Sequence, residues 1–224
     1  MAEELHSYFC ICGREMGIAP FYCGKLLSCP YCRSFVTVPF EEKGLAIQPS
    51  LNLTTPRLKI YPAQRRHWRA WYEIHSDPRN YDFEVSDPPS IVESKRQVKA
   101  SLFPRGFEKS HRLIFMVFND AGFAVGSVSV TFTQPYLMAV LGLMFHFEHQ
   151  GKGYGKEAVK RICDFLMQKW KVEKISAMCD SKNVACRGVL ERVGFRSEGM
   201  MRKYFYHPKR GWLDSPVYAL FRED

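Results

Sequence analysis

The chain has 224 residues, of which 46% are hydrophobic and 25% are charged, the ordinary balance of a soluble globular protein. No apolar run approaches the roughly 20 residues that a membrane-spanning helix needs, and the start Met1-Ala2-Glu3-Glu4 lacks the features of a signal peptide. We therefore expect a cytoplasmic protein without membrane contact, large enough for one ordinary domain and a small appendage.

The formal net charge is +9, and the first 48 residues contribute nothing to this excess. A basic main domain favours phosphorylated cofactors, acidic substrates or RNA as partners. It is equally consistent with a solvated surface, because no run of lysine and arginine is long enough to form a tail. Contact with RNA or the ribosome is therefore one open alternative.

Five of the eight cysteines fall between positions 10 and 32. In a cytosolic chain such clustering is typical of metal ligands rather than disulfides. A C-x-C pair and a C-x-x-C pair can complete a tetrahedral zinc site, which would be structural because four thiolates leave no open position. The expected Zn²⁺ ligands are Cys10, Cys12, Cys29 and Cys32. Cys23 or His6 could replace one of them, and cysteines without a metal are the alternative.

The residues around these cysteines resemble small bacterial zinc-ribbon modules of the pattern C-x-C-G…G-K-x₃-C-P-x-C…V-x-V-P. A piece of this length cannot build a stable core, so a metal would explain how it folds. We place the zinc-ribbon-like module at residues 1–40, a polar, aperiodic linker at 41–53 and the main domain at 54–224.

The main domain mixes strand-like and helix-like segments. The expected elements are a strand at 58–61, helices at 64–75 and 90–103, strands at 113–118, 125–132 and 137–147, a helix at 157–170, a strand at 174–179, a helix at 183–193 and closing strands at 195–207 and 215–221. This order predicts an α+β or three-layer α/β sheet rather than a barrel or a bundle.

Three glycines at alternate positions separate the strand at 137–147 from the following helix, in Gln150-Gly151-Lys152-Gly153-Tyr154-Gly155. They let the backbone turn tightly and keep side chains away from its amides. Amides that converge at the start of a helix suit a pyrophosphate. Taken alone, the turn could equally be a glycine-rich connection without a ligand.

The same six residues match the Q/R-x-x-G-x-G/A signature of the GCN5-related N-acetyltransferase (GNAT) superfamily. Asn183 to Cys186 and Leu190 to Phe195 resemble the later N-x-x-S…L-E-K-x-G-F segment of that family. Thr55 to Leu58 and Trp212 to Tyr218 are similar to the RimJ/RimL-type branch, which contains ribosomal-protein N-terminal acetyltransferases. The resemblance spans residues 54–223 and implies a three-layer α/β/α fold with a mixed, splayed sheet.

The resemblance also implies acetyl-CoA as the donor and indicates which residues bind it. Backbone groups before the turn would pair with the pantetheine arm, the turn would hold the pyrophosphate, and Asn183 would hydrogen-bond the arm or a water molecule. Taken alone, Asn183 could be only a helix N-cap, and either lysine of the turn could be a solvated charge. The expected cofactor-binding residues are Leu143, Met144, Phe145, Gln150, Gly151, Lys152, Gly153, Tyr154, Gly155, Lys156 and Asn183.

The catalytic residues depart from the family pattern. The family places a serine or tyrosine acid in the helix after the asparagine, where this chain has Cys186 and Leu190. A thiol donates a proton poorly, and Cys186 could simply be a packing residue. Relatives that acetylate protein N-termini often carry a glutamate near Val140, where this chain has no carboxylate.

His146 and Glu148 are the candidate bases beside the turn, together with His149. Further alternatives are Asp82, Glu84, Asp180 and Tyr206, or a chain of water molecules without a dedicated base.

The expected function is transfer of an acetyl group from acetyl-CoA to a primary amine, such as a protein N-terminus, by direct attack in a ternary complex. A small amine or an antibiotic is an alternative acceptor. The alternative of another class is a tethering protein, in which a zinc ribbon joins RNA or the ribosome to a GNAT domain that binds CoA without catalysis. The acceptor loops are expected at 79–89 and 206–212. The sequence has no signature of oligomeric state.

Overall fold

The structure is a computed structural model that describes residues 51–100, 111–134 and 137–222, together with four short N-terminal strands. Strand β1 (His6–Phe9) pairs with β2 (Glu15–Ile18), and β3 (Leu26–Ser28) pairs with β4 (Phe35–Thr37), both antiparallel. The four expected zinc ligands Cys10, Cys12, Cys29 and Cys32 lie outside the described residues. The zinc ribbon and the three-part division of the chain therefore stay predictions.

The main domain is built on one sheet of eight strands in the order β11-β12-β10-β9-β8-β7-β6-β5. The strands are β5 (Leu53–Thr54), β6 (Leu58–Pro62), β7 (His111–Asn119), β8 (Ala124–Gln134), β9 (Met138–Phe145), β10 (Lys174–Met178), β11 (Arg196–His207) and β12 (Gly211–Phe221). Every neighbouring pair is antiparallel except β9 and β10, which run parallel. A parallel pair needs a crossover connection, and the helix α3 (Tyr154–Trp170) provides it.

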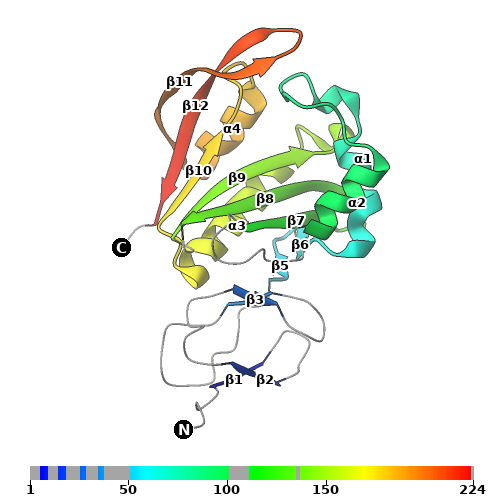
Figure 1. Ribbon diagram of the computed structural model, residues 1–224, viewed down its shortest axis with the longest axis vertical. Helices are drawn as coiled ribbons and strands as arrows, with labels where there is room; N and C mark the ends of the chain where they lie inside the picture. Colours follow the sequence, from blue (N-terminus) through cyan, green and yellow to red (C-terminus); the bar gives the residue numbers. More distant parts are fainter. Residues whose placement is uncertain are drawn as a thin grey trace.

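Two helices cover each face of the sheet (Figure 1). Helices α1 (Trp68–His75) and α2 (Ile91–Ala100) bury Trp71, Ile74 and Val98 against Ile114 and Met116 of β7. Helix α3 and helix α4 (Val184–Val193) pack on the other face, over the larger apolar core. The mixed sheet between two helical layers confirms the predicted order of strands and helices.

Helix α3 begins at Tyr154, three residues before the predicted start. Glycine is a poor helix former, so Gly155 argued for a later start. Packing of the residues that follow explains the difference, because Ala158 and Val159 are fully buried. A Cβ at Gly155 itself would make ordinary contacts, 3.4 Å from Val189 and 3.5 Å from the Phe145 ring. Burial of a large apolar side chain contributes about 1.5–3 kcal/mol, which exceeds the roughly 1 kcal/mol helix penalty of a glycine.

The parallel pair at the centre of the sheet opens into a wedge. Strands β9 and β10 pair from Met138↔Lys174 to Leu141↔Ala177, whereas β9 stays paired with β8 as far as Phe145. The two strands separate toward their C-terminal ends, as Figure 1 shows. The last residues of β9 therefore have a ladder partner on one side only among the described strands.

Within the described ranges, no helix is long and apolar enough to cross a membrane. In the same ranges, no three or more histidine, cysteine, aspartate or glutamate side chains converge as a metal site.

Candidate active site

The end of β9 directs backbone hydrogen-bonding groups into the wedge. The His146 amide donates to the Val125 carbonyl at 2.9 Å, so it points toward β8. Because backbone groups alternate along a strand, those of Phe145 and Leu143 point to the opposite side, toward β10. Met144, the third residue predicted here, packs its side chain partly against the α1–α2 core. Two of the three predicted residues thus present amide and carbonyl groups to the opening.

The glycine turn follows directly, through a 3₁₀ turn at Phe147–His149. Gly151 and Gly153 have φ angles of 75° and 80°, a left-handed conformation that residues with a Cβ rarely adopt. Nothing lies within 4 Å of the position that a Cβ of Gly151 would take. Gly153 is the N-cap of α3, so the amides of the first helical turn remain available for an anion.

Gln150 ties this turn to its surroundings. Its side-chain amide donates to the Phe145 carbonyl at 3.1 Å and to Asn80 Oδ1 at 2.9 Å. Gln150 therefore joins the end of β9 to the loop between α1 and α2.

Arg57, which was not among the predicted site residues, clamps the turn from outside. Its guanidinium donates to both the Glu157 carboxylate, at 2.6 and 2.8 Å, and the Lys152 carbonyl, at 3.1 Å. It also lies 5.0 Å from the centre of the Tyr154 ring. Burial raises the pKa of Glu157, but hydrogen bonds from Thr55 and Arg57 outweigh it and bring the pKa below its usual value.

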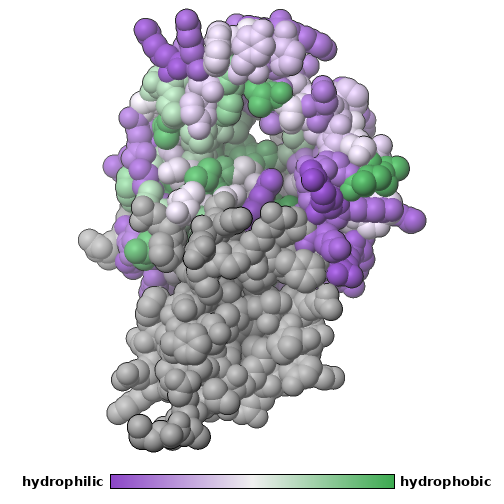
Figure 2. Space-filling model, viewed as in Figure 1, coloured by the Kyte–Doolittle hydropathy of each residue, from purple (hydrophilic) through white to green (hydrophobic). Residues whose placement is uncertain are grey.

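A cavity of about 1230 Å³ joins these parts to the loop between α1 and α2. Its walls are the wedge, the glycine turn, the first turns of α4 and the loop between α1 and α2. Figure 2 shows this face of the domain hollowed, with hydrophobic residues around the opening. Ligand pockets usually measure about 300–1,000 Å³, so the cavity has room for two reactants.

The lysines of the turn differ in position. Lys156 lines the cavity, whereas Lys152 is not one of the described lining residues. The Lys152 carbonyl instead accepts from Arg57.

The loop between α1 and α2 brings carboxylates to the cavity. Asp82, Glu84 and Asp87 line it, together with Glu93 on the first turn of α2. Burial raises the pKa of Glu84 above its usual value, toward the range in which a carboxylate works as a base at neutral pH. Glu84 was only one of several sequence alternatives, because its burial depends on the tertiary fold.

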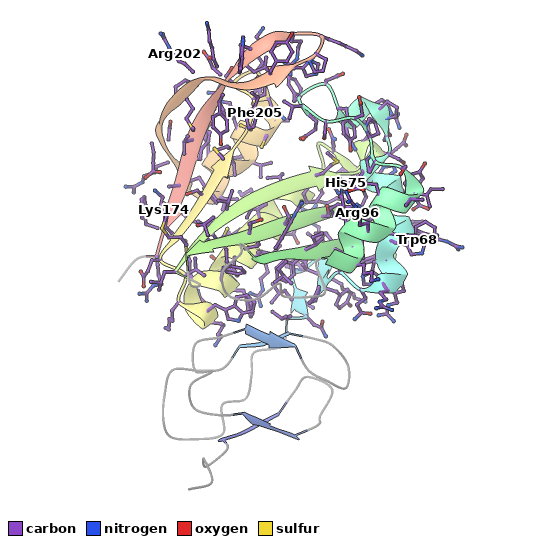
Figure 3. The ribbon with its side chains drawn as sticks, in the orientation of Figure 1. Trp68, His75, Arg96, Lys174, Arg202 and Phe205 are labelled. Atoms are coloured by element: carbon purple, nitrogen blue, oxygen red, sulfur yellow. The ribbon has the colours of Figure 1, made fainter. Side chains whose placement is uncertain are left out.

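His75 lies at the C-terminal end of α1, beside the same cavity, and Figure 3 shows it across the opening from Phe205 of β11. Its ring stacks on Trp71 at 3.6 Å between centroids, and its Nε2 lies 2.9 Å from Ser127 Oγ. Burial, with a smaller effect of Arg112, lowers the pKa of His75 to about 3. His75 is therefore neutral at physiological pH. Its contacts with Trp71 and Ser127 join the end of α1 to strand β8 at the cavity wall.

The Tyr81 hydroxyl donates to the His75 carbonyl at 2.6 Å and so fixes the loop after α1 to the end of that helix. Burial, followed by the charge of Glu84, raises the pKa of Tyr81 to about 12. The sequence contains the i, i+4 spacing that stacks Trp71 and His75, but nothing in it pairs His75 with Ser127.

Asn183 caps α4, since its Oδ1 accepts from the Cys186 amide at 2.9 Å. This is the helix-cap role that the residue type suggested. Asn183 also lines the cavity, as does Cys186. The pKa of Cys186 is raised, first by its hydrogen bond with Cys179 and then by burial, so Cys186 stays a protonated thiol.

The candidate bases His146 and Glu148 are not among the described residues that line the cavity. The chain turns after Phe145, so the His146 ring accepts from the Glu148 amide at 3.3 Å and helps to cap the turn. The Glu148 carboxylate, whose side chain is 64% exposed, lies 3.5 Å from Arg79. His149 does line the cavity, and burial is the first cause that lowers its pKa.

Comparison with known proteins identifies the architecture. Residues 57–196 match the acetyltransferase (GNAT) domain family. The uncharacterized N-acetyltransferase YnaD of Bacillus subtilis is 25% identical over 181 residues, which cover 78% of this chain and 99% of YnaD.

Two solved structures share the fold. Ribosomal-protein-S5-alanine acetyltransferase from Vibrio fischeri has a TM-score of 0.67 at 18% identity, over 78% of this chain and 98% of that protein. Spermidine N-acetyltransferase from Vibrio cholerae, solved with CoA and spermine, has a TM-score of 0.66 at 18% identity, over 75% and 97%. With the family match over most of the main domain, the chain belongs to the GNAT family of acetyltransferases.

Proposed function

We propose that this acetyltransferase moves an acetyl group from acetyl-CoA to the primary amine of a protein N-terminus, by direct attack in a ternary complex. The observation that carries the proposal is the continuity of one cavity. It joins the bare edge of β9, the glycine turn and the carboxylates of the α1–α2 loop. Donor and acceptor could therefore meet without leaving the protein.

The donor side fits CoA through its backbone. Amides of Gly151 to Lys156 would hold the pyrophosphate, and the Lys156 side chain would add charge. Leu143 and Phe145 would pair with the pantetheine arm as a neighbouring strand does. The amide of one of them would polarise the thioester carbonyl during attack.

Glu84 would serve as the base on the acceptor side. An amine can attack only when uncharged, and most amines are protonated at neutral pH. The partly buried carboxylate of Glu84 lines the cavity, and its raised pKa makes it a better proton acceptor than an ordinary glutamate. Asp82 and Asp87, which line the same wall, would attract the cationic form of the acceptor.

Cys186 would assist the leaving thiolate. Its raised pKa keeps the proton on sulfur, so it can donate a hydrogen bond, although its strength as a full acid is low. A packing role for Cys186 agrees with the same burial. Turnover of Cys186→Ala at the wild-type rate would remove the residue from the mechanism.

The choice of a protein N-terminus rests on the resemblance to the ribosomal-protein branch and on the ribosomal-protein acetyltransferases that share the fold. A small polyamine is the second candidate. The observation that favours it is the set of four carboxylates along the acceptor wall, which would suit several positive charges. The spermidine acetyltransferase of the same fold acts on such a molecule.

Two measurements test the proposal. Millimolar acetyl-CoA should raise the melting temperature, because a ligand at 100 times its Kd stabilises by about 2.7 kcal/mol. An unchanged melting temperature would refute donor binding. Acetylation should then be followed by mass spectrometry with N-terminal peptides and spermidine in equal amounts. Preferential acetylation of spermidine would favour the second candidate over the first.

The N-terminal module stays a separate proposal. We infer a structural Zn²⁺ held by Cys10, Cys12, Cys29 and Cys32 from their spacing alone. Elemental analysis should find about one zinc per chain, lost in the double variant Cys29→Ser, Cys32→Ser. The tethering alternative predicts a CoA-binding protein that acetylates no amine.

A further inference from the structure

Two cysteine thiols line the cavity between the end of β10 and the start of α4. Cys179 follows the last residue of β10, and Cys186 lies in the first turn of α4. Both are free, both are partly exposed, and both line the cavity. Their side chains are in hydrogen-bond contact.

Local hydrogen bonds hold both thiols in place. The Cys179 carbonyl accepts from Ser215 Oγ at 2.8 Å, which fixes the end of β10 to β12. The Cys186 amide donates to Asn183 Oδ1 at 2.9 Å, which fixes the start of α4. Between them, Asp180 closes a short turn by accepting from the Lys182 amide at 2.8 Å. The contact between the thiols is therefore built into the fold rather than left to a mobile loop.

We propose that Cys179 and Cys186 form a reversible disulfide that switches off the acetyl-CoA site, with a hydroperoxide as the oxidant. The regulatory part rests on the proposed function, while the modification site stands on the thiol pair itself.

The two thiols have different chemical characters. The hydrogen bond from Cys186 lowers the pKa of Cys179, which makes Cys179 the more readily ionised thiol of the pair. Arg187 lowers it further, against burial and the charges of Asp180 and Glu191. Cys186 keeps its proton, and the charge of Glu84 contributes to its raised pKa. A thiolate is the form that oxidants attack, so Cys179 should react first.

The reaction balances with one peroxide per pair. The Cys179 thiolate attacks a peroxide oxygen, the O–O bond breaks, and the leaving hydroxide takes up a proton to become water. Cys179 is now a sulfenic acid. Without the neighbouring thiolate, Cys186 loses its proton more readily, attacks the Cys179 sulfur and expels a second water. Two thiols are oxidised and hydrogen peroxide is reduced to two waters. A dithiol reductant reverses the step by exchange.

The bond would reshape the donor site. Bonding distance between two sulfur atoms is much shorter than hydrogen-bond contact, so the first turn of α4 must shift toward β10. Asn183, the expected pantetheine contact, is one of the six residues between the two cysteines. A misplacement of about 1 Å can lower a rate by about 10²-fold, and we expect a loss of that order.

Trypsin separates this pair from the other six cysteines. It cuts after Lys174, Lys182 and Arg187, giving peptides 175–182 and 183–187 with one cysteine each. The intact protein is treated with hydrogen peroxide, its remaining thiols are alkylated, and the digest is analysed by mass spectrometry. We expect these two peptides to be joined, separable by dithiothreitol, and joined more slowly when acetyl-CoA is present. Two separately alkylated peptides would overturn the proposal.

Activity provides an independent check. Peroxide should lower turnover of the wild-type protein about 10²-fold, with recovery in dithiothreitol. Cys179→Ser, compared with its own reduced-state activity, should lose this sensitivity. Equal sensitivity in Cys179→Ser would refute the switch. A reduced protein that neither binds acetyl-CoA nor acetylates amines would refute the proposed function instead, while the joined peptides would still report the thiol pair.

Discussion

The proposed donor and acceptor sides of the wedge are built in different ways. The donor side consists of backbone groups, from the bare edge of β9 and from the amides between Gly151 and α3. The acceptor side consists of side chains from distant segments, such as His75 against Ser127 and Glu84 in the α1–α2 loop. A backbone site needs glycines at fixed spacing, which a sequence displays. A side-chain site needs only that the fold bring its members together.

Substitution of Gly151 should have the largest effect, a loss of affinity for acetyl-CoA. Gly151→Val forces a β-branched residue into a left-handed conformation within the turn whose amides we propose to bind the pyrophosphate. The backbone strain lowers the stability of the folded protein by on the order of 1–3 kcal/mol. Each lost charge-assisted hydrogen bond is worth about 1.5–3 kcal/mol, so the affinity for acetyl-CoA should fall 10- to 100-fold or more. Calorimetric titration with acetyl-CoA measures the change.

Gly122 offers a matched control. It has a φ of 82°, has nothing within 4 Å of its missing Cβ, and lies in the hairpin between β7 and β8. Gly122→Val should lose comparable stability but keep its affinity for acetyl-CoA. Equal loss of affinity in both variants would mean that strain, and not the amide cradle, explains the effect.

Substitution of Glu84 should separate the acceptor side from the donor side. Glu84→Gln removes the proposed base, and general base catalysis contributes about 10²–10⁴-fold, so turnover should fall by that factor. The thermal shift caused by acetyl-CoA should not change. The neighbouring Asp82→Asn should mainly raise KM for a cationic acceptor, since Asp82 lines the wall as a charge. A Glu84→Gln variant with wild-type turnover would exclude Glu84 as the base.

The pH dependence of stability gives a second test of Glu84. Burial raises the pKa of Glu84, so the folded chain holds this proton more tightly than the unfolded chain does. Between the unfolded and folded pKa values the contribution of Glu84 to stability therefore falls as pH rises. Glu84→Gln should remove this loss and be at least as stable as the wild type at neutral pH. Thermal melts from pH 4 upward, at about half-unit steps, follow the difference from just below the usual glutamate pKa.

Asn183 should give the smallest effect, and it tests whether a side chain contributes to the donor side. Asn183→Ala removes the cap of α4, which costs about 0.5–2 kcal/mol. Asn183→Ser keeps a capping oxygen and removes only the amide group. If Asn183 also binds pantetheine, the serine variant should melt near the wild type yet bind acetyl-CoA several-fold more weakly, by about 1 kcal/mol for one hydrogen bond. Unchanged affinity would leave Asn183 as a helix cap alone.

The sequence therefore located the backbone parts of the cavity better than its side-chain parts, for a physical reason. Helix and strand periodicity gave the element order, and three glycines located the turn. The wedge itself depends on where β9 and β10 stop pairing, which no local pattern specifies. His146 and Glu148 lie close to the turn in sequence, but the change of direction after Phe145 places them outside the described lining of the cavity.

The Arg57 clamp has a consequence for how the protein reaches its active form. Arg57 and Glu157 are 100 residues apart in the chain, yet their contact supports the turn that would receive the donor. Pairings between such distant residues form late, because the chain between them must first be closed into a loop. The donor site should thus be completed only when the span from Arg57 to Glu157 has folded. Binding of a donor analogue during refolding would then report when the contact between Arg57 and Glu157 has formed. Shortened proteins that begin after Arg57 should form the donor site slowly or incompletely.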